Sequence, residues 1–136
     1  MKLSQTYNPA LWAEIRKNRT LRIKLATESF YWFFHIYFGE HAKLPTADFQ
    51  REIYSLLEDP EIQQMVIVAF RGSGKSTIAT LAYPIWAILG KQKRKFLLIL
   101  SQTQPLAKVH LQNIKRTFET NELLRNDFGP VDETSD

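Results

Sequence analysis

The stretch with the most evident chemistry is residues 66–77, VIVAFRGSGKST. Gly72 and Gly74 let the backbone turn its N–H groups toward an anion, and Lys75 brings a positive charge to the same loop. The hydroxyl of Ser76 is of the kind that binds Mg²⁺. An apolar run precedes the loop and a helical pattern follows it, so the positive end of that helix would face the phosphates. The spacing therefore predicts a phosphate-binding loop that takes ATP with Mg²⁺.

The loop departs from the usual pattern G-x-x-x-x-G-K-[ST] at its first position, where this chain has Ala69. A second interpretation is a flexible, glycine-containing linker before a helix. Arg71 either stabilises charge on a transferring phosphate, together with Lys75, or pairs with a carboxylate. The predicted contacts in the loop are Arg71, Gly72, Ser73, Gly74, Lys75, Ser76 and Thr77, with Ser76 as the metal ligand.

Local patterns predict the elements that must position this loop. Asn8 followed by Pro9 is typical of a helix start, and Thr20 is expected to cap a second helix. Two apolar runs lack charged residues and are expected to be buried strands. Helices are predicted over about 9–18, 21–38, 46–57 (starting at Thr46 or Asp48), 75–89 and 105–121, and strands over 65–70 and 96–100.

The order strand, loop, helix, strand predicts a parallel βαβ unit behind three helices. The expected fold class is therefore α/β, an incomplete P-loop NTPase. Its expected parts are a helical segment over 1–40, which is basic over 1–28, the front of a P-loop ATPase core over 41–129, and a tail over 130–136.

Three motifs resemble the N-terminal ATPase domain of large terminase subunits, the DNA-packaging motors of tailed bacteriophages. They are the variant loop AFRGSGKS at 69–76, FQREIYSLL at 49–57, and ILSQTQPLAKVHLQNIKRTFE at 99–119. In that family the second motif corresponds to an adenine-binding segment, so the resemblance implies that Gln50 contacts the base. A solvent-exposed Gln50 is the alternative. The third motif is similar to a helicase-like strand and helix, where Ser101 and Thr103 either contact DNA, couple to the nucleotide or cap a helix.

The resemblance implies an ATP-hydrolysing motor that packages double-stranded DNA into procapsids, with a portal protein and a small terminase subunit as partners. It also implies that the protein is located in the cytoplasm of a bacterial host. ATP hydrolysis by such a loop needs a second element, an apolar strand that ends in an acidic pair. No such strand follows Leu100. Asp132 and Glu133 form an acidic pair, but they follow Pro130, which is unsuited to a central strand, and they lie in the expected tail. The chain is thus expected to be an N-terminal fragment that binds ATP without turning it over. Open strand edges predict self-association.

Two other functions stay open at this point. One is another helicase-like P-loop ATPase. The other is a non-catalytic module that binds DNA or a partner through the basic stretch 16–24. The basic loop 91–95 is expected to lie away from the nucleotide, as a solvated loop or a contact for DNA or a partner.

Composition excludes several further functions. The net charge is +4, and residues 1–28 hold six cations against two acidic residues, so the whole excess lies there. There is no cysteine, and the three histidines lack metal-ligand spacing. The densest apolar run, Phe30–Phe38, has nine residues, whereas a bilayer span needs about 20. No membrane association is expected.

Overall fold

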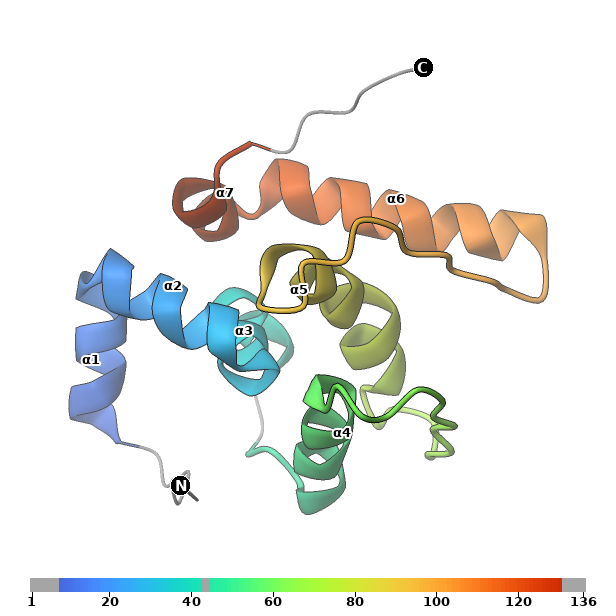
Figure 1. The fold of residues 1–136 in the computed structure, drawn as a ribbon, viewed down its shortest axis with the longest axis horizontal. Coiled ribbons are helices and arrows are strands. Elements are labelled where there is room, and N and C mark those ends of the chain that lie inside the picture. The colour runs from blue at the N-terminus through green and yellow to red at the C-terminus, as the bar shows by residue number, and fades with distance from the viewer. Residues whose placement is uncertain (1–7, 43–44, 131–136) are drawn as a thin grey trace.

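The computed structural model describes residues 8–42 and 45–130, and every regular element among them is a helix. Figure 1 shows α6 lying across one side of the molecule, with α7 beside α2 and with α4 at the opposite side. The elements are α1 (Pro9–Lys17), α2 (Arg19–Glu28), α3 (Phe30–Tyr37), the 3-10 helix η1 (Gly39–His41), α4 (Asp48–Glu58), the π-helical segment η2 (Thr77–Ala82), α5 (Tyr83–Leu89), α6 (Gln104–Thr120) and α7 (Glu122–Phe128).

The core is built around the aromatic helix α3. Phe30 and Phe33 are fully buried, and Phe30 packs within 5.4–5.6 Å of the rings of Tyr54, Tyr83 and Trp86. The indole N–H of Trp86 donates to the carbonyl of Ala26 at 2.9 Å, which joins α5 to α2. The aromatic run that is too short for a membrane span therefore forms the centre of a helical domain. No helix in the described ranges is long and apolar enough to cross a bilayer.

The segment predicted as one helix over 21–38 is two helices that meet at Ser29. Asn18, not Thr20, caps α2 by accepting from Leu21 N–H at 3.0 Å. Glu58, at the end of α4, accepts from the N–H of Phe30 at 3.1 Å and so satisfies the start of α3. The break depends on this distant carboxylate, which no local pattern indicates.

A buried ion pair fixes α7 to the N-terminal helices. Asp127 accepts hydrogen bonds from Arg22 and from the hydroxyl of Tyr37, each with a distance of 2.7 Å. Arg22 also donates to the carbonyls of Ile15 and Arg16 at the end of α1. One side chain thus connects α1, α2 and α7.

The helix after the glycine-containing loop begins at Lys75, as predicted, and is continuous to Leu89. Pro84 lacks the N–H that an α-helix would use, and the preceding turns are π-helical, with Tyr83 N–H bonded to Ile78 O. Pro84 therefore changes the register of the helix without ending it.

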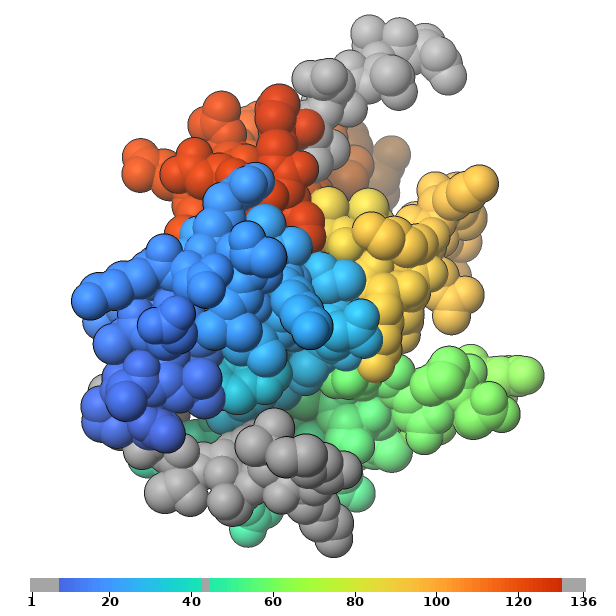
Figure 2. Space-filling model, turned by 60° about the vertical axis from the view of Figure 1, so that its left-hand side comes forward, coloured from blue at the N-terminus to red at the C-terminus, as the bar shows by residue number. Residues whose placement is uncertain are grey.

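The α/β fold class and its parallel βαβ unit are wrong. Residues 62–70 and 96–100 contain no helix, and no strand or sheet forms anywhere in the described ranges. Both runs expose their apolar side chains: Val68 is 92% exposed and Leu100 is 82% exposed. Figure 2 shows the chain after α4 and the chain after Gly90 projecting from the body of the molecule. The sequence pattern indicated burial because the runs are apolar, but the core is already filled by α3, α5 and their neighbours.

Candidate functional site

The loop between Phe70 and Lys75 has the backbone that its glycines predict. Gly72 and Gly74 have φ values of +85° and +81°, in the left-handed region that side chains disfavour. Ser73 N–H donates to Phe70 O at 3.3 Å, and Ile78 N–H donates to Gly74 O at 2.9 Å, which starts the helix. The loop therefore turns tightly and ends at the N-terminus of a helix, where backbone N–H groups can bind an anion.

The side chains of Arg71, Lys75 and Ser76 in the loop are available for binding. The ammonium of Lys75 lies across the loop, 3.3 Å from Phe70 O. Arg71 and Ser76 are exposed, and no ion pair of Arg71 exists within residues 8–42 and 45–130. The alternative in which Arg71 pairs with a carboxylate is thus not found in this part of the chain.

A cavity of about 550 Å³ opens beside the loop. Gly72, Ser73, Gly74 and Thr77 line one side, and the rest of the lining includes residues of α3, η1 and α4 and of the segment that leads into α4. Apart from its two chain neighbours, no residue that the structure describes has an atom within 4 Å of the place that a Cβ on Gly72 would occupy, so the outer part of the loop has open space next to it. The volume falls in the range of small-molecule sites.

Gln50 joins α4 to the loop. Its Nε2 donates to Ser73 O at 2.9 Å, and its Oε1 accepts from Ala47 N–H at 3.1 Å. Ser73 is buried, with 2% of its surface exposed. Gln50 therefore holds the loop in place. Its predicted contact with a base stays a prediction, although Gln50 does line the cavity.

The cavity includes Glu40 and His41, on η1, which sequence reasoning missed. The aromatic side chains of Phe49 and Phe70, which lie in the motifs of the resemblance, also line it. The two phenyl rings pack edge to face with centroids 5.6 Å apart. Gly39 follows an aromatic helix, and its sequence pattern predicted only the end of that helix. No local pattern therefore predicted that η1 would line the cavity.

His35 fixes the chain that enters α4. Its Nδ1 lies 2.8 Å from Tyr31 O, and since a carbonyl only accepts, Nδ1 carries the proton. Nε2 then accepts from the hydroxyl of Thr46 at 2.8 Å, and Thr46 lines the cavity. Burial, together with the charge of Arg51, lowers the pKa of His35 and favours this neutral form.

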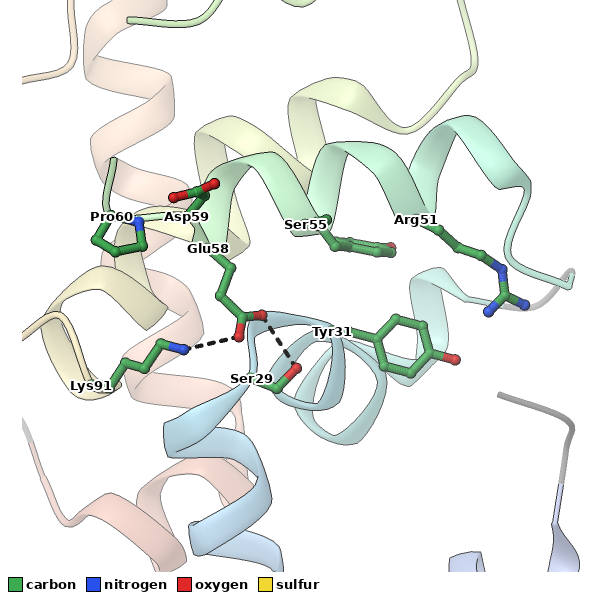
Figure 3. Close-up of a pocket in the computed structure, with 9 residues that line it drawn as sticks. Ser29, Tyr31, Arg51, Ser55, Glu58, Asp59, Pro60 and Lys91 are labelled. Atoms are coloured by element: carbon green, nitrogen blue, oxygen red, sulfur yellow. Dashed lines mark hydrogen bonds and ion pairs between the residues drawn. The ribbon is translucent and has the colours of Figure 1, made fainter. Parts of the chain in front are cut away.

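A second cavity, of about 520 Å³, lies on another face of α4. Figure 3 shows Glu58 between Lys91, whose ammonium is 3.0 Å away, and Ser29. Gln92 donates to Leu57 O and accepts from the hydroxyl of Tyr83. The front of the basic loop 91–95 is therefore held against α4 and α5, while its four cations stay exposed, and a contact of this loop with DNA or a partner stays a prediction.

The basic stretch 16–24 is divided between two roles. Arg22 is buried and bound to Asp127, so it is unavailable to a nucleic acid. The side chain of Arg19 is 62% exposed and contacts the same aspartate. Arg16, Lys17 and Lys24 are exposed.

Ser101 and Thr103 precede α6. Thr103 accepts from Leu106 N–H at 3.4 Å and caps the helix, which was one of the expected roles. The acidic pair Asp132–Glu133 lies outside the described residues. Within the described ranges no group of three or more His, Asp or Glu could hold a metal ion.

No family model, no curated protein and no solved structure matches the chain.

Proposed function

We propose that the loop at residues 71–77 binds the triphosphate of ATP together with Mg²⁺. The observation that carries this proposal is the combination of two left-handed glycines, a helix that begins at Lys75 and an adjoining cavity of about 550 Å³. Backbone N–H groups from Gly72 to Lys75 surround the phosphates, and Lys75 moves from Phe70 O to neutralise them. Ser76 is the residue that would hold Mg²⁺, and the ion would neutralise charge on the phosphates. Arg71 lies in the same loop, as a cation for the γ-phosphate.

The broader proposal rests on the resemblance to large terminase subunits. In it, the chain corresponds to the N-terminal part of a motor that packages double-stranded DNA, with a portal protein and a small subunit as partners, in the cytoplasm of a bacterial host. Gln50 supports both parts, because it connects the loop to the helix that the resemblance assigns to the base.

Nucleotide binding is tested by isothermal titration calorimetry with a non-hydrolysable ATP analogue and Mg²⁺. Lys75→Ala is expected to weaken binding about 10- to 100-fold, because hydrogen bonds to charged groups contribute about 1.5–3 kcal/mol. Lys108→Ala removes an equal charge from the exposed face of α6 and is expected to leave the affinity unchanged. Equal affinity in wild type and Lys75→Ala would overturn the proposal.

The DNA-binding alternative is weakened by the burial of Arg22, which removes one cation from the basic stretch. It predicts salt-dependent DNA binding that survives Lys75→Ala and is lost when Arg16, Lys17 and Lys24 are all replaced by Gln. ATPase assays of the same proteins test the expectation that this chain binds nucleotide without turnover.

A further inference from the structure

The segment Ile62–Phe70 is one of two apolar stretches of the described chain whose backbone is largely without hydrogen-bond partners there. From Met65 to Phe70 the exposure alternates from residue to residue: Met65, Ile67 and Ala69 are partly buried, whereas Val66 and Val68 are 88% and 92% exposed. A period of two is the pattern of an extended strand. From Gln63 to Ala69, no backbone N–H or C=O has a hydrogen-bond partner within residues 8–42 and 45–130. Such a segment is a template for strand addition.

The charges at the ends of this segment indicate what it pairs with. Glu61 precedes it and Arg71 follows it, and both are exposed. In an antiparallel pair of two identical segments centred on Val66, each Glu61 lies opposite the other copy's Arg71. The same register places Ile62 opposite Phe70. We propose that two copies of this chain associate through antiparallel pairing of Ile62–Phe70, with Val66 on the two-fold axis and two Glu61–Arg71 ion pairs at the ends.

The proposed register is self-complementary in its side chains as well as its charges. On the exposed face, Val66 meets its own copy, and Gln64 lies opposite Val68. Cross-strand pairs of this kind stabilise a sheet, and an isologous contact forms each of them twice. The other unpaired apolar segment, Phe96–Leu100, is preceded by three cations and followed by no acidic residue before α6, so it lacks this complementarity.

Sedimentation equilibrium of the full chain over a wide concentration range tests the pairing. The wild type is expected to show a monomer–dimer equilibrium. Val68→Lys is expected to raise the dissociation constant at least about ten-fold, because the substitution acts twice in the dimer. Val68 is almost fully exposed, so this variant should keep the wild-type circular dichroism spectrum and melting temperature of the monomer. The matched control is Val109→Lys on α6, where the valine is 46% exposed and lies outside the proposed interface.

Charge reversal tests the register itself. Glu61→Arg is expected to raise the dissociation constant about ten-fold, and adding Arg71→Glu is expected to restore it, since the ion pairs reform with opposite polarity. Lys75→Ala should leave the dimer unchanged, which separates this association from nucleotide binding. A monomer at all concentrations, an equal effect of Val109→Lys, or a double reversal that fails to restore the dimer would each overturn the proposal.

Discussion

Replacing Asp127 with Ala should remove a large part of the stability of this protein. In the folded chain the side chain of Asp127 is fully buried and that of Arg22 is 9% exposed. Removing the carboxylate leaves the guanidinium of Arg22 buried without its counter-charge and the hydroxyl of Tyr37 without its acceptor. Breaking one partner of a buried pair costs about 3–5 kcal/mol, out of about 5–15 kcal/mol for a typical domain.

Urea unfolding followed by tryptophan fluorescence measures this loss. Arg19→Ala is the matched control, because Arg19 contacts the same aspartate from the surface, with a nitrogen–oxygen distance of 3.6 Å in the ion pair. It is expected to cost only about 0–1 kcal/mol. If Asp127→Ala is no more destabilising than Arg19→Ala, then α7 does not depend on this ion pair and the reasoning is refuted.

The same pair also predicts how acid acts on the protein. Burial alone would raise the pKa of Asp127, but hydrogen bonds from Arg22 and Tyr37 and the nearby positive charges outweigh it and lower the pKa below 3.8. A lowered carboxyl pKa stabilises the fold above the unfolded value, and this stabilisation is lost as the pH falls through the folded value. Asp127→Asn should therefore lose stability at neutral pH and show a weaker dependence on pH below about 4 than the wild type.

Two further predictions concern the chain around the cavity. Gly74→Ala should lower the free energy of unfolding by about 1–2 kcal/mol because residue 74 has a φ of +81°. Crowding is not the cause, since the atom nearest to the new Cβ would be 3.4 Å away. Gly39→Ala, at a position with open space, is the control, and equal melting temperatures of the two variants would contradict the prediction. The pKa of His35 is lowered from 6.5, so the unfolded state binds the proton first and the free energy of unfolding should fall as the pH drops below about 6.5. Urea unfolding at a series of pH values measures this dependence, and His35→Phe should remove it. An unchanged pH dependence in His35→Phe would contradict the neutral form assigned to His35.

The backbone turn at residues 72–74 and the helix start after it could be predicted from sequence because their determinants are local. Glycines at 72 and 74 allow the left-handed turn, and Lys75 stands at the first turn of a helix that the apolar pattern also indicates. The start of α1 at Asn8 and Pro9 was confirmed for the same reason, since the asparagine caps the helix within three residues.

The two strands were wrong because strand formation requires a partner that local sequence does not name. Residues 65–70 and 96–100 have the composition of buried strands, yet no hydrogen bonds join them in the described part of the chain. The α7 helix was missed because no helix was predicted after about residue 121. Its stability comes from Asp127 and Arg22, which are 105 residues apart.

The most direct measurement of the central claim is an NMR titration of the backbone amides with a non-hydrolysable ATP analogue and Mg²⁺. The largest shifts are expected at Gly72, Ser73, Gly74 and Lys75, with small shifts across Phe96–Leu100. In Lys75→Ala the same shifts should need about 10- to 100-fold more ligand. Loop amides that do not move, or that move equally in Lys75→Ala, would contradict the assignment of this loop to a triphosphate.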